Sequence, residues 1–435
     1  MHEMYDLIVI GAGPAGLMAA QTAARGGLDV LLLEQKTNIA YIGRTCVAGL
    51  ITEPDCDGET VTVEGDQIVF HRNDFSIRYS GLWNAIKGYY FVSPGGYRIR
   101  LEREATCVAR TFNKEVLLED LLVETEKSGV RIERATQALK ALNVADEVVV
   151  NIYQEEKEQE VRGRFVIAAD GVNSRIAENL GLNKERKFFG TMMVYGYVLE
   201  GVETPYPDAI IAFLGRGQTV GCKGQFYFWP RPPRKPQDPP LWEIMYAQPM
   251  GLGDHKEILN KFIKNGRFSS WFKHAQVVKK TSVVLNFRTP IQEPRAGNIL
   301  VIGDAASFIE VYVQGAIMYG YRSAKAVLDE MEGKSGLDEY VDYWKGSYEY
   351  LRPGMIEEAL RGYGIQMLED SDLDYLFGLT DSKSYKGYYN EFSFPGVIQQ
   401  AITAEIPRIM KERPELIQKI QNLFEKATVE ETLMI

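Results

Sequence analysis

The apolar positions of the first 34 residues predict a strand, a helix and a second strand in that order. Residues Leu7 to Ile10 form a continuous apolar run, as in a strand that is buried on both faces. A helical pattern follows and ends at Gly26-Gly27, and Val30 to Leu33 form the second apolar run. Because a helix usually joins two parallel strands, we expect a βαβ unit here.

Two later segments repeat the order of an apolar strand followed by a polar turn. In residues 164–175 the strand ends at Ala169-Asp170-Gly171. Residues 298–320 contain a strand, then Gly303-Asp304, and a loop into a helix that we expect to begin near Gly315. Ligands of open α/β sheets bind beyond the carboxyl ends of the strands, so both turns are candidate ligand sites.

The pattern changes between these motifs. Residues 61–100 and 190–287 contain aromatic-rich stretches with alternating polarity, which predict a mostly antiparallel sheet. Residues 107–128 are expected to form an acidic helix whose apolar stripe consists of Val116, Leu117, Leu121 and Val123. From Leu337 onward the chain is predicted to be mostly helical, and its amphipathic stretch 398–424 is interrupted by Pro407 and Pro414.

The predicted fold class is therefore α/β, with three parts. A discontinuous Rossmann-like βαβ domain is expected from residues 1–60, 101–180 and 288–335. An antiparallel-sheet substrate domain is expected from residues 61–100 and 181–287, and a helical C-terminal region from residues 336–435.

Composition narrows the classes of function. The chain has 435 residues, with 49 basic against 59 acidic side chains and a net charge of −10, which argues against nonspecific nucleic-acid binding. The four histidines are scattered, so we expect no metal site. The cysteines (Cys46, Cys56, Cys107 and Cys222) have no regular spacing, which favours a reducing cytosol. No apolar run reaches the roughly 18 residues that span a bilayer, and the early first strand leaves no room for a signal peptide.

The first turn has the chemistry of a dinucleotide site. Gly11, Gly13 and Gly16 have the G-x-G-x-x-G spacing that permits a tight turn, close approach of a pyrophosphate and close helix packing. The N-terminus of the helix offers unpaired N–H groups to that pyrophosphate. Glu34 follows the second strand, where a carboxylate can accept hydrogen bonds from a ribose. A glycine turn without a nucleotide is the alternative.

The three motifs in this order resemble the glutathione-reductase-type FAD fold shared by aromatic hydroxylases, flavin halogenases and geranylgeranyl reductases. The resemblance covers roughly residues 1–330 and implies that FAD is the cofactor. It implies that Asp170-Gly171 supports the cofactor and that Asp304 presents its carboxylate to the ribitol. A helix-capping role for Asp304 is the alternative.

Within this group, the chain resembles most the geranylgeranyl reductase family, whose members saturate isoprenoid double bonds. Ile42-Gly43-Arg44-Thr45-Cys46 places Cys46 at the family's cysteine beside the flavin. Arg110 corresponds to the family's arginine at the start of a long helix, and residues 225–230 resemble the aromatic strand that lines the lipid cavity, with Tyr227 and Trp229 at its aromatic positions. The chain departs from the family at Val47-Ala48, at Gln225 and in the loop after Asp304. There Gln314-Gly315-Ala316-Ile317 stands where the family has a triple glycine followed by Ile, and Glu310-Val311 stands where a proline is common nearby.

The resemblance and the motifs together give a set of residues expected to bind FAD. The N–H groups of Gly315 and Ala316 are expected to face the flavin and to stabilise negative charge on it. The complete set is Gly11, Gly13, Pro14, Ala15, Gly16, Glu34, Gln35, Arg44, Thr45, Arg110, Ala138, Asp170, Gly171, Gly303, Asp304, Gly315, Ala316 and Ile317.

Cys46 and the aromatic strand have alternative interpretations. Cys46 is a candidate proton donor, helped by Arg44, but a buried cysteine can also be an inert apolar residue or form a redox pair with Cys56. Tyr227 and Trp229 are expected to face one side of their strand and Phe226 and Phe228 the other, so that one pair lines a substrate pocket. The alternative is that all four pack within the sheet.

The sequence predicts an FAD-dependent oxidoreductase that reduces a carbon–carbon double bond of a hydrophobic substrate, such as an isoprenoid, by hydride transfer from reduced flavin N5. A monooxygenase or halogenase and a non-catalytic electron-relay protein are the alternatives. The expected partners are an apolar small-molecule substrate and an external electron donor, NAD(P)H or ferredoxin. We expect a cytoplasmic protein whose C-terminal helices form a packing or dimer face, with peripheral membrane contact as the alternative.

Overall fold

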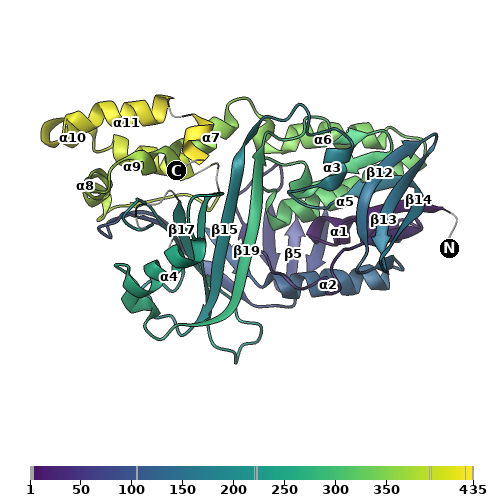
Figure 1. Ribbon diagram of the computed structural model, residues 1–435, viewed down its shortest axis with the longest axis horizontal. Coiled ribbons are helices and arrows are strands. Elements are labelled where there is room, and N and C mark those ends of the chain that lie inside the picture. Colours follow the sequence, from purple (N-terminus) through teal and green to yellow (C-terminus); the bar gives the residue numbers. More distant parts are fainter. Residues whose placement is uncertain are drawn as a thin grey trace.

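Two large sheets lie toward opposite ends of an elongated molecule (Figure 1). The computed structural model describes residues 4–103, 106–219, 221, 224–390, 392, 394–426 and 428–433. The N-terminal sheet carries the three sequence motifs, and the second sheet carries most of the aromatic strands.

The N-terminal sheet has a parallel core with strand order β11-β2-β1-β14-β21. These strands are β1 (Tyr5–Ile10), β2 (Val30–Leu33), β11 (Arg131–Glu133), β14 (Lys157–Ala168) and β21 (Ile299–Val301). An antiparallel meander of β12 (Gln137–Val144) and β13 (Glu147–Gln154) extends the sheet from the first half of β14, and β20 (Arg295–Ala296) pairs with β21. The register pairs Ile10 with both Leu33 and Ala168, and Ala168 with Val301. The loops that follow β1, β2, β14 and β21 therefore leave the same edge of the sheet.

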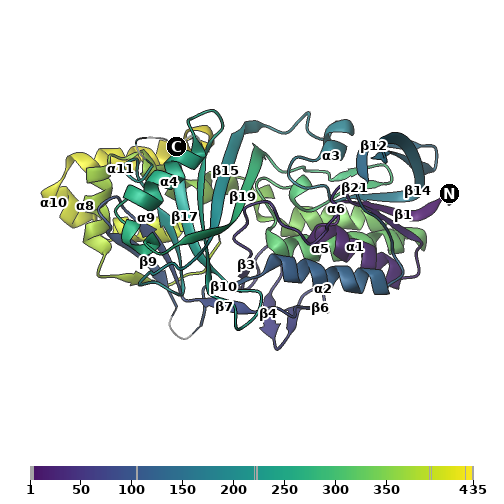
Figure 2. The same cartoon turned by 60° about the horizontal axis from the view of Figure 1, so that its bottom comes forward.

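Helices cover this sheet and explain its buried strands (Figure 2). Helix α1 (Pro14–Arg25) packs against α5 (Tyr312–Met331) and α2 (Lys114–Lys127), and α5 packs against α6 (Gly336–Ser347). Gly320 permits the close approach of α5 to α1, because a Cβ there would lie 2.2 Å from the carbonyl oxygen of Ala15. The short helix α3 (Arg175–Asn179) follows the loop after β14.

The second sheet has the order β19-β15-β18-β17-β16-β8-β9-β22 and is mostly antiparallel. Its strands are β8 (Gly88–Val92), β9 (Arg98–Glu102), β15 (Phe188–Glu200), β16 (Ala209–Phe213), β17 (Gln225–Arg231), β18 (Leu241–Pro249), β19 (Gln276–Arg288) and β22 (Ser384–Tyr385). The pairs β16–β8 and β22–β9 are parallel. Two small sheets accompany it: β3 (Gly49–Ile51) with β10 (Ala109–Phe112) and β7 (Trp83–Ile86), and β4 (Val61–Glu64) with β5 (Gln67–Phe70) and β6 (Phe75–Arg78).

Helices lie on both faces of the second sheet (Figure 1). Helix α4 (His255–Asn265) covers one face, where Phe226 and Phe228 join its aromatic core. The C-terminal helices cover the other face, on which Tyr227 and Trp229 lie. They are α7 (Met355–Arg361), α8 (Asp370–Thr380), α9 (Phe394–Thr403), α10 (Ile406–Glu412), α11 (Glu415–Lys426) and α12 (Val429–Leu433). Leu416 and Ile420 are buried in this second core, so the C-terminal region packs on the sheet as predicted.

The fold class and the βαβ unit are confirmed, but several predicted boundaries were wrong. The helix expected over residues 107–128 begins at Lys114, because Asn113 accepts hydrogen bonds from the N–H groups of Glu115 and Val116 as its N-cap, and strand β10 precedes it. The side chain of Val123, assigned to the apolar stripe, is 46% exposed. Helix α5 begins at Tyr312, three residues before the predicted start at Gly315. The predicted domain limits stay a prediction.

Neither a disulfide nor a membrane-spanning helix is found in the part of the chain that the structure describes. Cys46, Cys56 and Cys107 are not in disulfide bonds, and Cys222 lies outside the described residues. Among the described residues, every helix is too short or too polar to cross a bilayer.

Candidate active site

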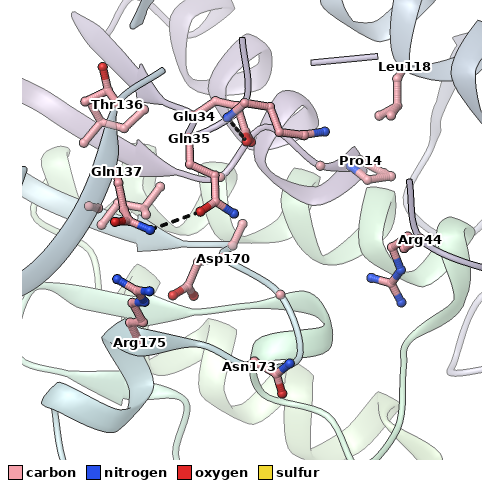
Figure 3. A pocket seen from close by; sticks show the side chains of 18 of the residues that line it. Pro14, Glu34, Gln35, Arg44, Leu118, Thr136, Gln137, Asp170, Asn173 and Arg175 are labelled. Atoms are coloured by element: carbon pink, nitrogen blue, oxygen red, sulfur yellow. Dashed lines mark hydrogen bonds between the residues drawn. The ribbon is translucent and has the colours of Figure 1, made fainter. Parts of the chain in front are cut away.

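A cavity of 270 Å³ lies at the edge of the parallel sheet where the strands end, and the loops after β1, β2 and β14 line it (Figure 3). Its walls include residues of all three loops together with side chains from α2 and β12. These residues include Gly11, Gly13, Pro14, Glu34, Gln35, Arg44, Lys114, Gln137, Ala138, Asp170, Gly171 and Arg175. Sequence segments far apart in the chain thus form one site.

The glycines of the first turn have different roles in this wall. Gly11 has φ +97°, and a Cβ there would lie 2.5 Å from the carbonyl oxygen of Ala169, so the turn itself requires glycine. A Cβ on Gly16 would lie 1.8 Å from the carbonyl oxygen of Gly11, which fixes the close packing of α1 on its turn. A Cβ on Gly13 would have no atom within 4 Å. Gly13 therefore faces open space at the N-terminus of α1.

Glu34 is held in the wall of the cavity by two backbone hydrogen bonds. Its Oε2 accepts from the N–H of Ala12 at 2.7 Å, and its Oε1 accepts from the N–H of Lys36 at 2.8 Å. The side chain is 5% exposed, and its oxygens keep further lone pairs for a ligand hydroxyl. Beside it the side-chain amide of Gln137 donates to the oxygen of Gln35 at 3.2 Å (Figure 3).

One carboxylate oxygen of Asp170 accepts a hydrogen bond, and the other accepts none within the described structure. Its Oδ2 accepts from the N–H of Ile176 at 3.2 Å, at the start of α3. Its Oδ1 is buried and has no hydrogen-bond partner among the described residues. Burial raises the pKa of this carboxyl. A buried acceptor without a partner is costly, so the wall beside Asp170 is suited to a ligand that donates a hydrogen bond.

A second cavity of 100 Å³ continues the first toward α5. Both cavities are lined by Gly13, Pro14, Arg44, Lys114, Ala169 and Gly171. The guanidinium of Arg44 donates to Asp304 Oδ2 at 3.4 Å, while Asp304 Oδ1 accepts from the N–H of Val311 at 3.2 Å. Cys46 lies in the same wall, and its sulfur is 3.7 Å from Nζ of Lys114.

A third, mainly apolar cavity of 220 Å³ lies between the second sheet and the C-terminal region. Met192, Val194, Tyr227, Met245 and Leu285 line it from one face of the sheet. Glu310 and Tyr312, which precede and begin α5, line both this cavity and the second one. Tyr312 has φ +52°, a left-handed conformation that is uncommon for residues other than glycine. Each of the three cavities therefore shares lining residues with the next.

Some residues expected in the site do not line the cavities. Gly16, Thr45, Arg110, Gly315 and Ile317 line neither cofactor-side cavity, and Trp229 does not line the apolar one. Their roles in binding stay predictions.

Three of these placements have a clear structural cause. Arg110 lies in strand β10 instead of at the start of a helix, paired with Leu50 and Ala85. Trp229 is fully buried in the core under the C-terminal helices. Thr45 bonds Thr281 at 2.9 Å, and Thr281 donates to the buried Glu243 at 3.0 Å, which links the 44–46 segment to the second sheet.

The sequence interpretation also missed several wall residues. Lys36, Leu118, Thr136, Asn173 and Arg175 line the first cavity, and Lys114 lines the first two. Lys114 was missed because the start of the helix was predicted wrongly. With Asn113 as the N-cap, Lys114 is the first residue of α2. Gln314, which lies in the first turn of α5, bonds the backbone of Ile51: its amide oxygen accepts at 2.6 Å and its nitrogen donates at 3.1 Å.

Comparison with known families decides the class of this site. Residues 76–311, more than half of the chain, match the model of an FAD binding domain, and residues 6–74 match a second FAD binding domain model. The chain belongs to the FAD-binding domain family. FAD as the cofactor, predicted from the three motifs, is thereby confirmed.

Relatives of this FAD-binding protein have names that agree with the predicted resemblance. It is 26% identical over 398 residues to the digeranylgeranylglycerophospholipid reductase of Methanocaldococcus jannaschii. The matched region covers 86% of this chain and 90% of the relative. The predicted resemblance to geranylgeranyl reductases and the prediction of an FAD-dependent oxidoreductase are confirmed by such relatives.

Solved structures show the same fold. A geranylgeranyl bacteriochlorophyll reductase-like protein of Thermoplasma acidophilum has a TM-score of 0.68 and 20% identity, over 97% of this chain and 99% of that one. The p-nitrophenol 4-monooxygenase of Pseudomonas putida has a TM-score of 0.63 and 14% identity, over 98% of this chain and 100% of that one. The fold is therefore shared by reductases and oxygenases and does not decide between them.

The residues present fit FAD. The two cofactor-side cavities run from Glu34, past the open space at Gly13, to Asp304, and so offer one elongated site. The unpartnered Oδ1 of Asp170 and the fixed carboxylate of Glu34 are acceptors, as hydroxyl-rich ribose and ribitol require.

Proposed function

We propose that this protein uses FAD to reduce a carbon–carbon double bond in a long apolar isoprenoid substrate. The observation that carries the proposal is that Glu310 and Tyr312 line both the apolar cavity and the second cofactor-side cavity, so that the two cavities are neighbours. A substrate in the apolar cavity would thus approach the cofactor without passing through solvent. The names of the relatives, digeranylgeranylglycerophospholipid reductases, support an isoprenoid lipid as the substrate.

The proposed cofactor contacts follow from the walls of the first two cavities. Glu34 would accept from the adenosine ribose, and the open N-terminus of α1 at Gly13 would hold the pyrophosphate. Arg44 and Lys114 would add positive charge beside it. Asp304, oriented by Arg44 and by the N–H of Val311, would accept from the ribitol. When bound and reduced by an external donor, the flavin would supply a hydride, which carries both electrons of the reduction.

The apolar cavity provides the other half of the site. Its wall of aliphatic and aromatic side chains favours a hydrocarbon chain through burial of apolar surface. It also keeps water from the reacting carbons. Cys46 lies in the cofactor-side wall against Lys114, and we propose that it contributes to the shape and polarity of that wall. An external electron donor, NAD(P)H or ferredoxin, and peripheral contact with the membrane that holds the lipid are further parts of the proposal.

Product analysis tests this function. The FAD-loaded protein is reduced with dithionite under strict anaerobiosis and mixed with a digeranylgeranylglycerophospholipid. The proposal predicts a product that has gained two hydrogen atoms per double bond and a flavin that returns to its oxidised spectrum. If the product instead carries labelled oxygen in a parallel reaction under ¹⁸O₂, and is absent without oxygen, the protein is a monooxygenase. A protein that shows neither product is not an enzyme for this lipid.

A further inference from the structure

Among the described residues that line the apolar cavity, only Glu310 has a carboxyl side chain. That cavity is lined by apolar side chains, tyrosines, two glutamines and a threonine, with Glu310 as its one carboxyl among the described lining residues. Glu310 also lines the second cavity, together with Arg44, Cys46 and Asp304. A group at this place can reach both a substrate and the space next to the cofactor.

The surroundings of Glu310 favour its protonated form. Burial raises the pKa of the Glu310 carboxyl, and the neighbouring carboxylate of Asp304 raises this pKa further. The positive charges of Arg44 and Lys114 oppose the shift without cancelling it. Within the described part of the chain, the Glu310 carboxyl forms no ion pair, because Arg44 is paired with Asp304 instead. The backbone, by contrast, is fixed, since the Glu310 carbonyl accepts from the Tyr348 hydroxyl at 3.1 Å.

The other candidates for a proton donor are less well placed. Cys46 lines the second cavity but not the apolar one. Tyr312 lines both, but an ordinary phenol has a pKa of about 10 and is a weaker acid at neutral pH than a carboxylic acid. Glu310 combines the position of Tyr312 with the stronger acid.

We propose that Glu310 is the acid that protonates the substrate, an inference that rests on the proposed reduction. Reduction of one double bond needs a hydride on one carbon and a proton on its neighbour. The carboxyl O–H bond of Glu310 breaks, a C–H bond forms at the second carbon, and Glu310 is left as a carboxylate. The hydride and its electron pair come from a reduced flavin, which is oxidised. Arg44 and Lys114 stabilise the carboxylate until it regains a proton from solvent after the product has left.

The substitution Glu310→Gln tests the inference in the FAD-loaded full chain, with Glu349→Gln as its matched control. Glu349 is a buried glutamate whose pKa is likewise raised by burial, but it lines none of the three cavities. Glu310→Gln is expected to keep its thermal midpoint, its FAD affinity and its KM within about twofold, because the amide has the size of the acid. Its kcat for a digeranylgeranylglycerophospholipid is expected to fall about 100-fold or more. Glu349→Gln keeps the wild-type kcat.

A second measurement does not depend on turnover. The infrared band of a protonated carboxylic acid at pH 7 is expected to lose intensity in Glu310→Gln relative to the wild type. An unchanged band shows that Glu310 is ionised and overturns the inference. So does a kcat for Glu310→Gln within about threefold of the wild type, or a loss of kcat in Cys46→Ala that Glu310→Gln does not share. If the wild type itself leaves every double bond intact, the proposed function fails, and the catalytic part of the inference fails with it.

Discussion

The guanidinium of Arg44 lies 3.4 Å from the carboxylate of Asp304, although the two residues are 260 positions apart in the chain. This contact joins the segment after β2 to the turn after β21. Two parts of the chain that are far apart in the sequence therefore line the same cavity.

Asp304→Ala is expected to lower FAD affinity about 10- to 100-fold, because a hydrogen bond to a charged group contributes about 1.5–3 kcal/mol. The substitution also removes the acceptor of the Val311 N–H group. Titration of the apoprotein with FAD, followed by flavin fluorescence, measures the change. Asp338→Asn is the control, because Asp338 pairs with Arg295 at a 74% exposed position outside the cavities. Equal FAD affinity in Asp304→Ala and Asp338→Asn would show that Asp304 does not contact the cofactor.

Two glycines of the first turn should respond differently to the same substitution. Gly13→Ala is expected to fold with the wild-type thermal midpoint but to bind FAD at least about tenfold more weakly, because its methyl group occupies the open space at the N-terminus of α1. Gly16→Ala is expected to destabilise the apoprotein by about 1–3 kcal/mol, since its Cβ would overlap the Gly11 carbonyl. Calorimetry and FAD titration separate the two effects. Wild-type FAD affinity in Gly13→Ala would place the cofactor elsewhere.

A pair of neighbouring residues on β19 tests the apolar cavity. Leu285 lines the cavity, whereas the preceding residue, Val284, points to the opposite face of the strand and is 36% exposed. Leu285→Trp is expected to raise KM for the lipid at least about tenfold by filling the cavity, with FAD affinity unchanged. Val284→Trp should keep the wild-type KM. A similar KM in the two variants would mean that the lipid does not enter this cavity.

Stability should depend on pH through Asp57, a buried residue away from the cavities. Burial raises the pKa of its carboxyl from 3.8 to about 7. Between these values the folded protein binds a proton that the unfolded chain releases, so stability is full below pH 4 and falls as the pH rises to 7. The loss amounts to about 4 kcal/mol at about 1.36 kcal/mol per pKa unit.

Asp57→Asn removes this term while it keeps an acceptor for the Glu349 N–H, now 3.1 Å from Asp57 Oδ1. Asparagine also tolerates the φ of +49° at this position. The variant is expected to match the wild type at pH 4 and to exceed its thermal midpoint at pH 8. A difference in midpoint that does not grow with pH would contradict the assignment.

Local sequence patterns predicted the parts of the site that depend on local structure. Gly11, Gly13 and Glu34 lie within one βαβ unit, whose period and turn chemistry specify their places. The order of the Asp170 and Asp304 turns was enough to predict that they meet at one edge of the sheet. The faces of β17 also followed from alternation, with Phe226 and Phe228 on one side and Tyr227 on the other.

The residues that were missed depend on packing between distant segments. Trp229 is on the same face as Tyr227, but alternation does not tell how far along a strand a cavity extends, and the C-terminal helices cover Trp229. Glu310 had no local signal of function in the sequence. Its importance arises because two cavities, lined by the second sheet and by the first loops, meet at this residue.

The most direct test of the account is the rate at which the anaerobically reduced, FAD-loaded protein is reoxidised by a digeranylgeranylglycerophospholipid in a stopped-flow instrument. The account predicts that flavin absorbance returns in the absence of oxygen, and that one double bond is lost for each flavin oxidised. A flavin that stays reduced until oxygen is admitted would contradict it.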